Sequence, residues 1–72
     1  MDANELLRLY DDKKGRQCTL TLEDETTLSG EFVTVMVKTS VDNSVLSADL
    51  VLNTDGQEWK FPNGFIKNIK FD

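Results

Sequence analysis

From Arg16 to the C-terminus the chain repeats with a period of two, and this alternation limits its possible folds more than any other feature. Cys18, Leu20 and Leu22 alternate with polar neighbours, which is typical of a strand with one buried face. Further runs of this kind follow, separated by polar or glycine-containing turns. The pattern predicts five strands, at about residues 16–23, 27–37, 45–52, 57–61 and 65–71.

The N-terminal residues follow a helical period instead. Asp2 and Glu5 have the spacing of a helix N-cap and its partner residue, and Leu6 and Leu9 recur at helical spacing. We therefore expect a short amphipathic helix over about residues 3–11. Such a helix is too short to persist in water, so it must lie against an apolar surface.

A single glycine, Gly30, lies inside the second predicted strand, where glycine is normally unfavourable. It predicts a bend at which a side chain would collide with the helix or with the opposite sheet. Short strands close into a barrel only when the long ones bend strongly, at glycines and bulges. The predicted fold class is therefore all-β with a short N-terminal helix: a small, strongly bent five-stranded antiparallel barrel of SH3-like type, with an OB-type barrel as the alternative. One domain, residues 1–72, is expected.

Three details of this fold are expected from the apolar pattern. The segment "FVTVMV" is apolar on both sides, so the helix or another chain should cover its second face. Asp55-Gly56 predicts a tight hairpin, and Trp59 and Phe61 should be buried on one face of the fourth strand. The third strand should face inward with Leu46, Ala48, Leu50 and Leu52.

Composition excludes several classes of protein. Cys18 is the only cysteine and the chain has no histidine, so neither an internal disulfide nor a zinc site of Cys and His is possible. The net charge of −5 argues against nonspecific binding of nucleic acid. No apolar run reaches the roughly 20 residues of a membrane helix, and no signal peptide is recognisable. We expect a soluble cytoplasmic protein without a membrane partner.

Catalysis is not expected, and neither is a cofactor or a metal. Without histidine the chain has no usual general base near neutral pH. Cys18 lies at an inward strand position with no base to activate it. The carboxylates of "LEDET" lie in a turn, where acidic side chains are normally solvated.

Five residues resemble a known motif. Leu22, Asp24, Leu28, Gly30 and Phe32 stand at the spacings of the first motif of the Sm and Sm-like family. The N-terminal helix and five strands extend the resemblance over nearly the whole chain. It implies an Sm-like fold and a closed homo-oligomeric ring of about five to seven subunits. Divergent Sm-like proteins include phage-encoded ones.

The departures from the family pattern concern its RNA site. Glu25 stands where the family turn usually has glycine, and Met36 where RNA-binding members have an aspartate. In "IKNI", Lys67 and Asn68 replace the arginine and glycine of the second motif. The histidine-containing signature of the bacterial Hfq branch is absent.

The resemblance implies two candidate surfaces. A pocket for single-stranded RNA would combine the loop after the second strand with the last loop, and a ring would use the last two strands. The RNA candidates are Asn43, Ser44, Asp42, Lys67 and Asn68; the interface candidates are Trp59, Phe61, Phe65, Ile66, Ile69 and Phe71.

Two functions remain open from the sequence. One is a ring-forming, RNA-associated subunit that binds single-stranded RNA or helps an RNA machinery to assemble. The other is an oligomeric assembly module of Sm-like fold that has lost RNA binding. Lys67, Asn68 and the basic cluster of Lys13, Lys14 and Arg16 favour the first, whereas the acidic charge and Met36 favour the second. The basic cluster is also explained as a solvated loop at a helix C-terminus.

Overall fold

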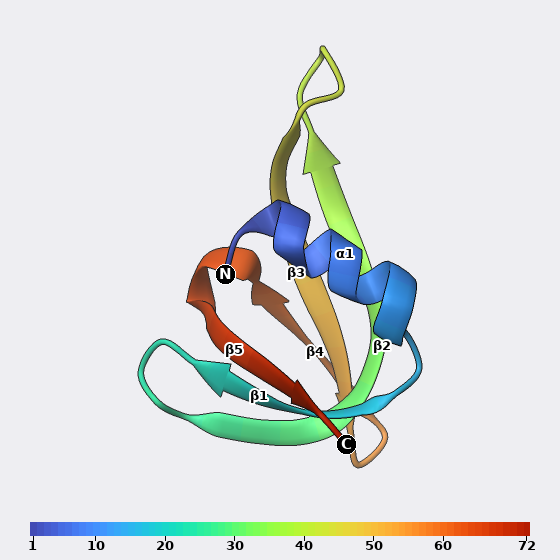
Figure 1. Ribbon diagram of the computed structural model, residues 1–72, viewed down its shortest axis with the longest axis vertical. Helices are drawn as coiled ribbons and strands as arrows, with labels where there is room; N and C mark the ends of the chain where they lie inside the picture. The colour runs from blue at the N-terminus through green and yellow to red at the C-terminus, as the bar shows by residue number, and fades with distance from the viewer.

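The computed structural model describes residues 1–72 as one α-helix followed by a five-stranded antiparallel sheet (Figure 1). The predicted order of helix and strands is confirmed, and the observed bounds differ from the predicted ones by at most two residues. The elements are α1 (Ala3–Lys13), β1 (Gln17–Leu22), β2 (Thr27–Thr39), β3 (Val45–Thr54), β4 (Gln57–Pro62), the short 3-10 helix η1 (Asn63–Phe65) and β5 (Ile66–Phe71).

The sheet has the strand order β4-β3-β2-β1-β5 and is open. The first part of β2 pairs with β1 and the rest pairs with β3, with Glu31 in both ladders. β4 pairs only with β3 and β5 only with β1. The expected closure into a barrel is therefore wrong: the structure is a strongly bent sheet with two free edges.

The N-terminus and η1 connect the start of β5 to β3. The amine of Met1 donates to the carbonyl of Ile66, the first residue of β5. The side chain of Asn63 holds both neighbours, because Nδ2 donates to the Met1 carbonyl over 2.9 Å and Oδ1 accepts from the backbone N–H of Ala48 over 3.2 Å. Asn63 thus extends the β3 ladder just after Pro62, where β4 ends.

α1 lies across β2 and β3 and closes the core (Figure 1). Asp2 caps the helix by accepting a hydrogen bond from the backbone N–H of Asn4 at 2.9 Å. No helix of the structure has the length and apolar character needed to cross a lipid bilayer. Eight buried side chains make the core: Leu6, Cys18, Leu20, Phe32, Ala48, Leu50, Leu52 and Ile66.

A β-bulge at Val33 changes which face of β2 is buried. Phe32 pairs with Leu52, but Thr34 pairs with Val51, so Val33 is an extra residue in the ladder. Phe32 faces the core before the bulge and Val35 packs against it afterwards. The bulge explains much of the apolar character of both sides of "FVTVMV". The helix does not cover the second face, since Met36 remains 49% exposed within one chain, and its covering by another chain stays a prediction.

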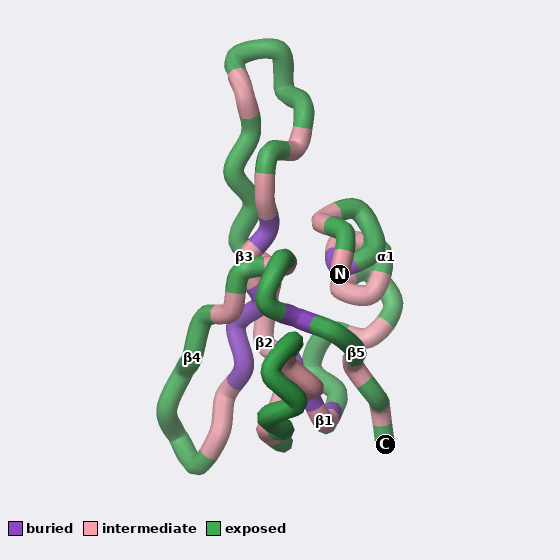
Figure 2. Tube along the Cα trace, turned by 90° about the vertical axis from the view of Figure 1, so that its left-hand side faces the viewer, coloured by how far each residue is buried: buried purple, intermediate pink, exposed green.

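Two expected burials are wrong, each for its own reason. Ala48, Leu50 and Leu52 are buried as predicted, but Leu46 is 67% exposed because the β2–β3 hairpin extends past α1 (Figure 2). Trp59 is 51% exposed because β4 is an edge strand with no neighbour on its outer side. The tight hairpin at Asp55-Gly56 is confirmed, with φ of 52° and 83° at the two residues.

Candidate functional site

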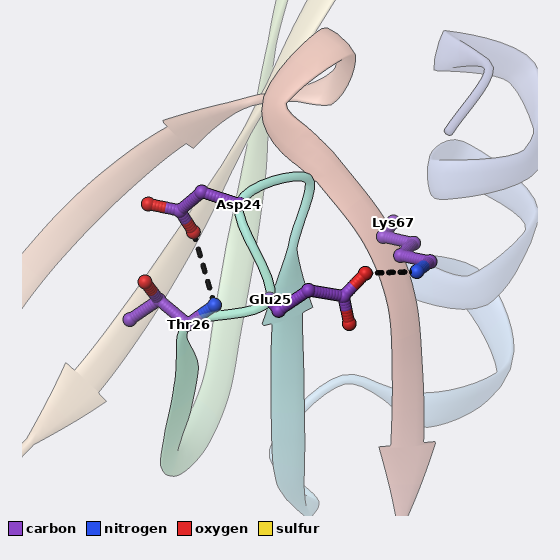
Figure 3. Close-up of polar contacts among 4 residues, drawn as sticks. All are labelled: Asp24, Glu25, Thr26 and Lys67. Carbon is purple, nitrogen blue, oxygen red and sulfur yellow. Dashed lines mark hydrogen bonds and ion pairs between the residues drawn. The ribbon is translucent and has the colours of Figure 1, made fainter.

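The acidic turn between β1 and β2 keeps the geometry of a glycine turn although it has no glycine. Glu25 has a φ of 71°, in the left-handed region that glycine normally occupies. Its N–H donates to the carbonyl of Leu22 at 2.9 Å. Asp24 Oδ1 accepts from the Thr26 N–H at 3.0 Å (Figure 3). Hydrogen bonds from the side chain and backbone of Thr26 lower the pKa of Asp24.

Lys67 of β5 forms an ion pair with Glu25 (Figure 3). Lys67 lies at an irregularity of the β1–β5 ladder, since Asn68 pairs with Thr21 and Ile66 pairs with Leu22. Both side chains are largely exposed. The hydrogen bond and the charge of Glu25 raise the pKa of Lys67, so this cation is already engaged within its own chain.

The tip of the β2–β3 hairpin is organised by Asp42. Its Oδ1 accepts hydrogen bonds from the hydroxyl of Ser40 and from the Ser44 N–H, the latter at 3.1 Å. These bonds, with that of Ser40 the largest contribution, lower the pKa of Asp42 to about 2. Asn43 takes a left-handed φ of 67°. Asp42 and Ser44 therefore stabilise the turn itself, and Asn43 is exposed beside them.

The structure does not bring the two halves of the expected RNA pocket together within one chain. The tip with Asn43 projects from one end of the molecule, whereas β5 lies in its body beside β1 (Figure 1). Lys67 and Asn68 meet the β1–β2 turn and β1 instead. A pocket of this kind would require a second subunit.

The interface candidates are of three kinds. Trp59 and Phe65 are more than half exposed, at 51% and 63%. Phe61, Ile69 and Phe71 pack partly against the core, and Phe71 stacks on Phe32 with ring centroids 5.9 Å apart. Ile66 is fully buried, so its side chain belongs to the core and offers no surface to a partner.

The basic cluster lies against the C-terminal end of the chain. Lys13 Nζ is 5.9 Å from the ring centroid of Phe71, and Lys14 Nζ is 5.5 Å from that of Tyr10. Arg16 Nη2 donates to a backbone carbonyl of the last residue at 2.7 Å. These contacts engage each cation within its own chain.

Two further cavities and the single cysteine do not indicate a catalytic or metal site. A polar groove of about 360 Å³ surrounds Gly30, Asn53 and Asp55, and a pocket of about 210 Å³ lies between Leu22 and Phe65. No group of three or more histidine, cysteine or carboxylate side chains is placed to hold a metal. Burial, and then the charge of Asp72, raise the pKa of Cys18 above its ordinary value, which leaves a neutral thiol in the core.

Two features of the site were not predicted from the sequence. The Glu25–Lys67 ion pair joins residues 42 positions apart, and only their opposite charge hinted at it. The bridging role of Asn63 had a weak signal, an asparagine directly after a proline at a strand end. A scan of family models, a search of curated proteins and a search of solved structures each found no match to this chain.

Proposed function

We propose that this protein is a subunit of a closed, Sm-like homo-oligomeric ring, in which β4 of one copy pairs with β5 of the next. The observation that carries the proposal is the pair of free edges. β4 and β5 are the two outer strands, and neither pairs with any other strand on its outer side. Free edges with apolar side chains invite another chain, and pairing removes that liability.

The direction of the two strands supports this pairing. β4 and β5 run in opposite directions across the molecule and are joined by η1 (Figure 1). A copy related by a modest rotation can therefore place its β5 antiparallel to β4 of its neighbour. The contact uses different surfaces on the two copies, so it is heterologous, and it closes into a ring when the rotation permits. The family resemblance suggests about five to seven subunits.

Exposed aromatic side chains beside these edges also support the proposal. Trp59 of β4 and Phe65 of η1 are two of the six large hydrophobic side chains that remain exposed. Aromatic residues are enriched at protein interfaces relative to the rest of the surface. A neighbouring subunit on β4 would cover Trp59 and add buried apolar area to a core of only eight side chains.

RNA binding is the second candidate, and it requires the ring. Asn43 is exposed at the hairpin tip and Lys67 is exposed at the start of β5. These residues lie apart within one chain, so an RNA site would combine the hairpin of one subunit with β5 of another. The ion pair of Lys67 with Glu25 and the net charge of −5 weigh toward an assembly module without RNA.

The mass of the protein in solution tests the ring directly. Multi-angle light scattering at micromolar concentration should give a single closed assembly. Trp59→Lys, on the free edge, should give smaller species, whereas Thr27→Lys, exposed at the start of β2, should leave the assembly intact. Far-ultraviolet circular dichroism checks that both variants are folded. A stable parent monomer would refute the proposal.

RNA binding is tested separately on the assembled protein. Titration with oligo-U and oligo-A at low and at high salt distinguishes the two candidates, because phosphate contacts weaken as salt rises. If the RNA site exists, Asn43→Ala and Lys67→Ala should each weaken binding without changing the mass. No binding at low salt would leave the assembly module as the function.

A further inference from the structure

The dipeptide Asn63-Gly64 in η1 has the sequence at which asparagine deamidates most readily. The backbone nitrogen that follows an asparagine can displace the side-chain amide, and glycine has no side chain to obstruct the approach. Asn63 is the only asparagine of the chain that precedes a glycine. Nothing lies within 4 Å of the position that a Cβ of Gly64 would take, so the fold does not crowd this residue either.

The reaction proceeds by closure and hydrolysis of a cyclic imide. The Gly64 nitrogen forms a bond to Asn63 Cγ and loses its proton, while Nδ2 leaves Cγ with that proton as ammonia. Water then opens the ring at either carbonyl. The products are aspartate, with the original main chain, or isoaspartate, in which the main chain runs through the side-chain carbon. Water is the only other reactant.

The fold holds Asn63 away from this reaction. Nδ2 donates to the Met1 carbonyl over 2.9 Å, and Oδ1 accepts from the Ala48 N–H over 3.2 Å. The backbone carbonyl of Asn63 accepts from the N–H of Ile66, which closes the turn of η1. Ring closure requires Cγ to turn toward the Gly64 nitrogen. Both side-chain partners lie elsewhere in the chain, so the amide must leave them before it can react.

We propose that Asn63 is a site of spontaneous deamidation that its native contacts protect and that local opening exposes. The modification of a residue that must first open follows the population of the open form. Two hydrogen bonds must break together, so the folded protein should react about 10- to 100-fold more slowly than the unfolded chain. The inference does not depend on the proposed ring, because all these contacts lie within one chain.

Deamidation makes the opening irreversible. The carboxylate of the product only accepts hydrogen bonds, so it cannot donate to the Met1 carbonyl as Nδ2 does. Two acceptors then face each other, and the segment before α1 loses its tie to η1. Isoaspartate also adds a carbon to the main chain between β4 and β5, which displaces the two strands relative to each other.

Peptide mapping by mass spectrometry tests the site on the full chain. The parent is kept at mildly alkaline pH, folded in buffer or unfolded in guanidinium chloride, and the conversion of each asparagine is followed with time. Asn63 should convert faster than every other asparagine of the unfolded chain, and about 10- to 100-fold more slowly when folded. Gly64→Ala is the matched variant: its methyl group meets no neighbour, and it should suppress conversion in the unfolded chain.

A second pair of variants measures the consequence. Asn63→Asp reproduces one product and should lower the melting temperature, whereas Asn4→Asp adds the same charge at an exposed position of α1 and should not. Equal rates in the folded and unfolded protein would overturn the protection. Conversion of Asn63 no faster than that of the other asparagines in the unfolded chain would overturn the site. An Asn63→Asp variant as stable as Asn4→Asp would overturn the loss of the tie.

Discussion

Gly30 of β2 lies directly against the backbone of Asn53 in β3. A methyl group at Gly30 would overlap the Asn53 carbonyl and come within 2.7 Å of Thr54 Oγ1. The next residue, Glu31, pairs with Gln17 of β1 on one side and with Asn53 on the other. Glycine therefore stands where β2 changes partners and passes close to the end of β3. The expected collision is with this neighbouring strand, not with the helix or an opposite sheet.

The first prediction is that Gly30→Ala destabilises the protein by about 1–3 kcal/mol, the usual cost of overpacking. The obstacle is mainly backbone, so the strands must shift to accept the methyl group. Gly64→Ala is the control, because nothing lies within 4 Å of the Cβ it would add. Urea denaturation followed by circular dichroism measures both. Equal stability of the two variants would contradict the close approach of β2 and β3.

The second prediction concerns the left-handed conformation of Glu25. At a φ of 71° an alanine keeps the steric strain, whereas glycine relieves it. Glu25→Gly should therefore be more stable than Glu25→Ala by about 1 kcal/mol. Both variants lose the ion pair with Lys67, so that loss cancels in the comparison. The free energies of unfolding in urea decide it, and an alanine variant as stable as the glycine variant would rule out a strained turn.

The fold could be predicted from the sequence where short-range chemistry determines it. Three features depend only on residues close to them in the sequence, and the structure has all three. They are the alternation from Cys18 onward, the N-cap at Asp2 and the Asp55-Gly56 turn. The bulge at Val33 could not be predicted, because an extra residue in a ladder depends on the partner strand. The exposure of Leu46 depends on where α1 stops covering β3, and the residues around Leu46 give no information about that position.

The candidate site could be predicted less well, for a related reason. The family pattern identified Glu25 as a residue that replaces glycine, and the structure retains the left-handed φ at that position. Its partner Lys67 comes from a strand 42 positions later, so sequence spacing could not reveal the pair. Asn43 and Lys67 were assigned to one site only because of the family resemblance. Within one chain they lie apart, one at the hairpin tip and the other on β5.

The third prediction is that the hairpin tip loosens in acid. The folded pKa of Asp42, about 2, is below its ordinary value of 3.8. Hydrogen bonding by Asp42 thus stabilises the tip fully above the ordinary pKa, and this contribution is lost as the pH falls toward 2. NMR titration of the Asp42 carboxyl and of the Ser44 amide measures the change. Ser40→Ala removes the largest cause and should raise the pKa; an unchanged midpoint in that variant would contradict the hydrogen bond.

The fourth prediction uses Trp59, the only tryptophan, as a reporter of the β4 edge. Its side chain is 51% exposed in one chain, so a neighbouring β5 in the ring should shield it from water. Fluorescence emission should lie at shorter wavelength in the assembled protein and shift to longer wavelength as dilution or moderate urea separates the subunits. Lys70→Glu changes a residue of β5 and leaves the surroundings of Trp59 within its own chain unaltered. If this substitution weakens the pairing of β5 with β4 of the next subunit, the emission of Trp59 should shift to longer wavelength. Emission typical of a half-exposed indole in the intact parent assembly would mean that subunits join through another surface.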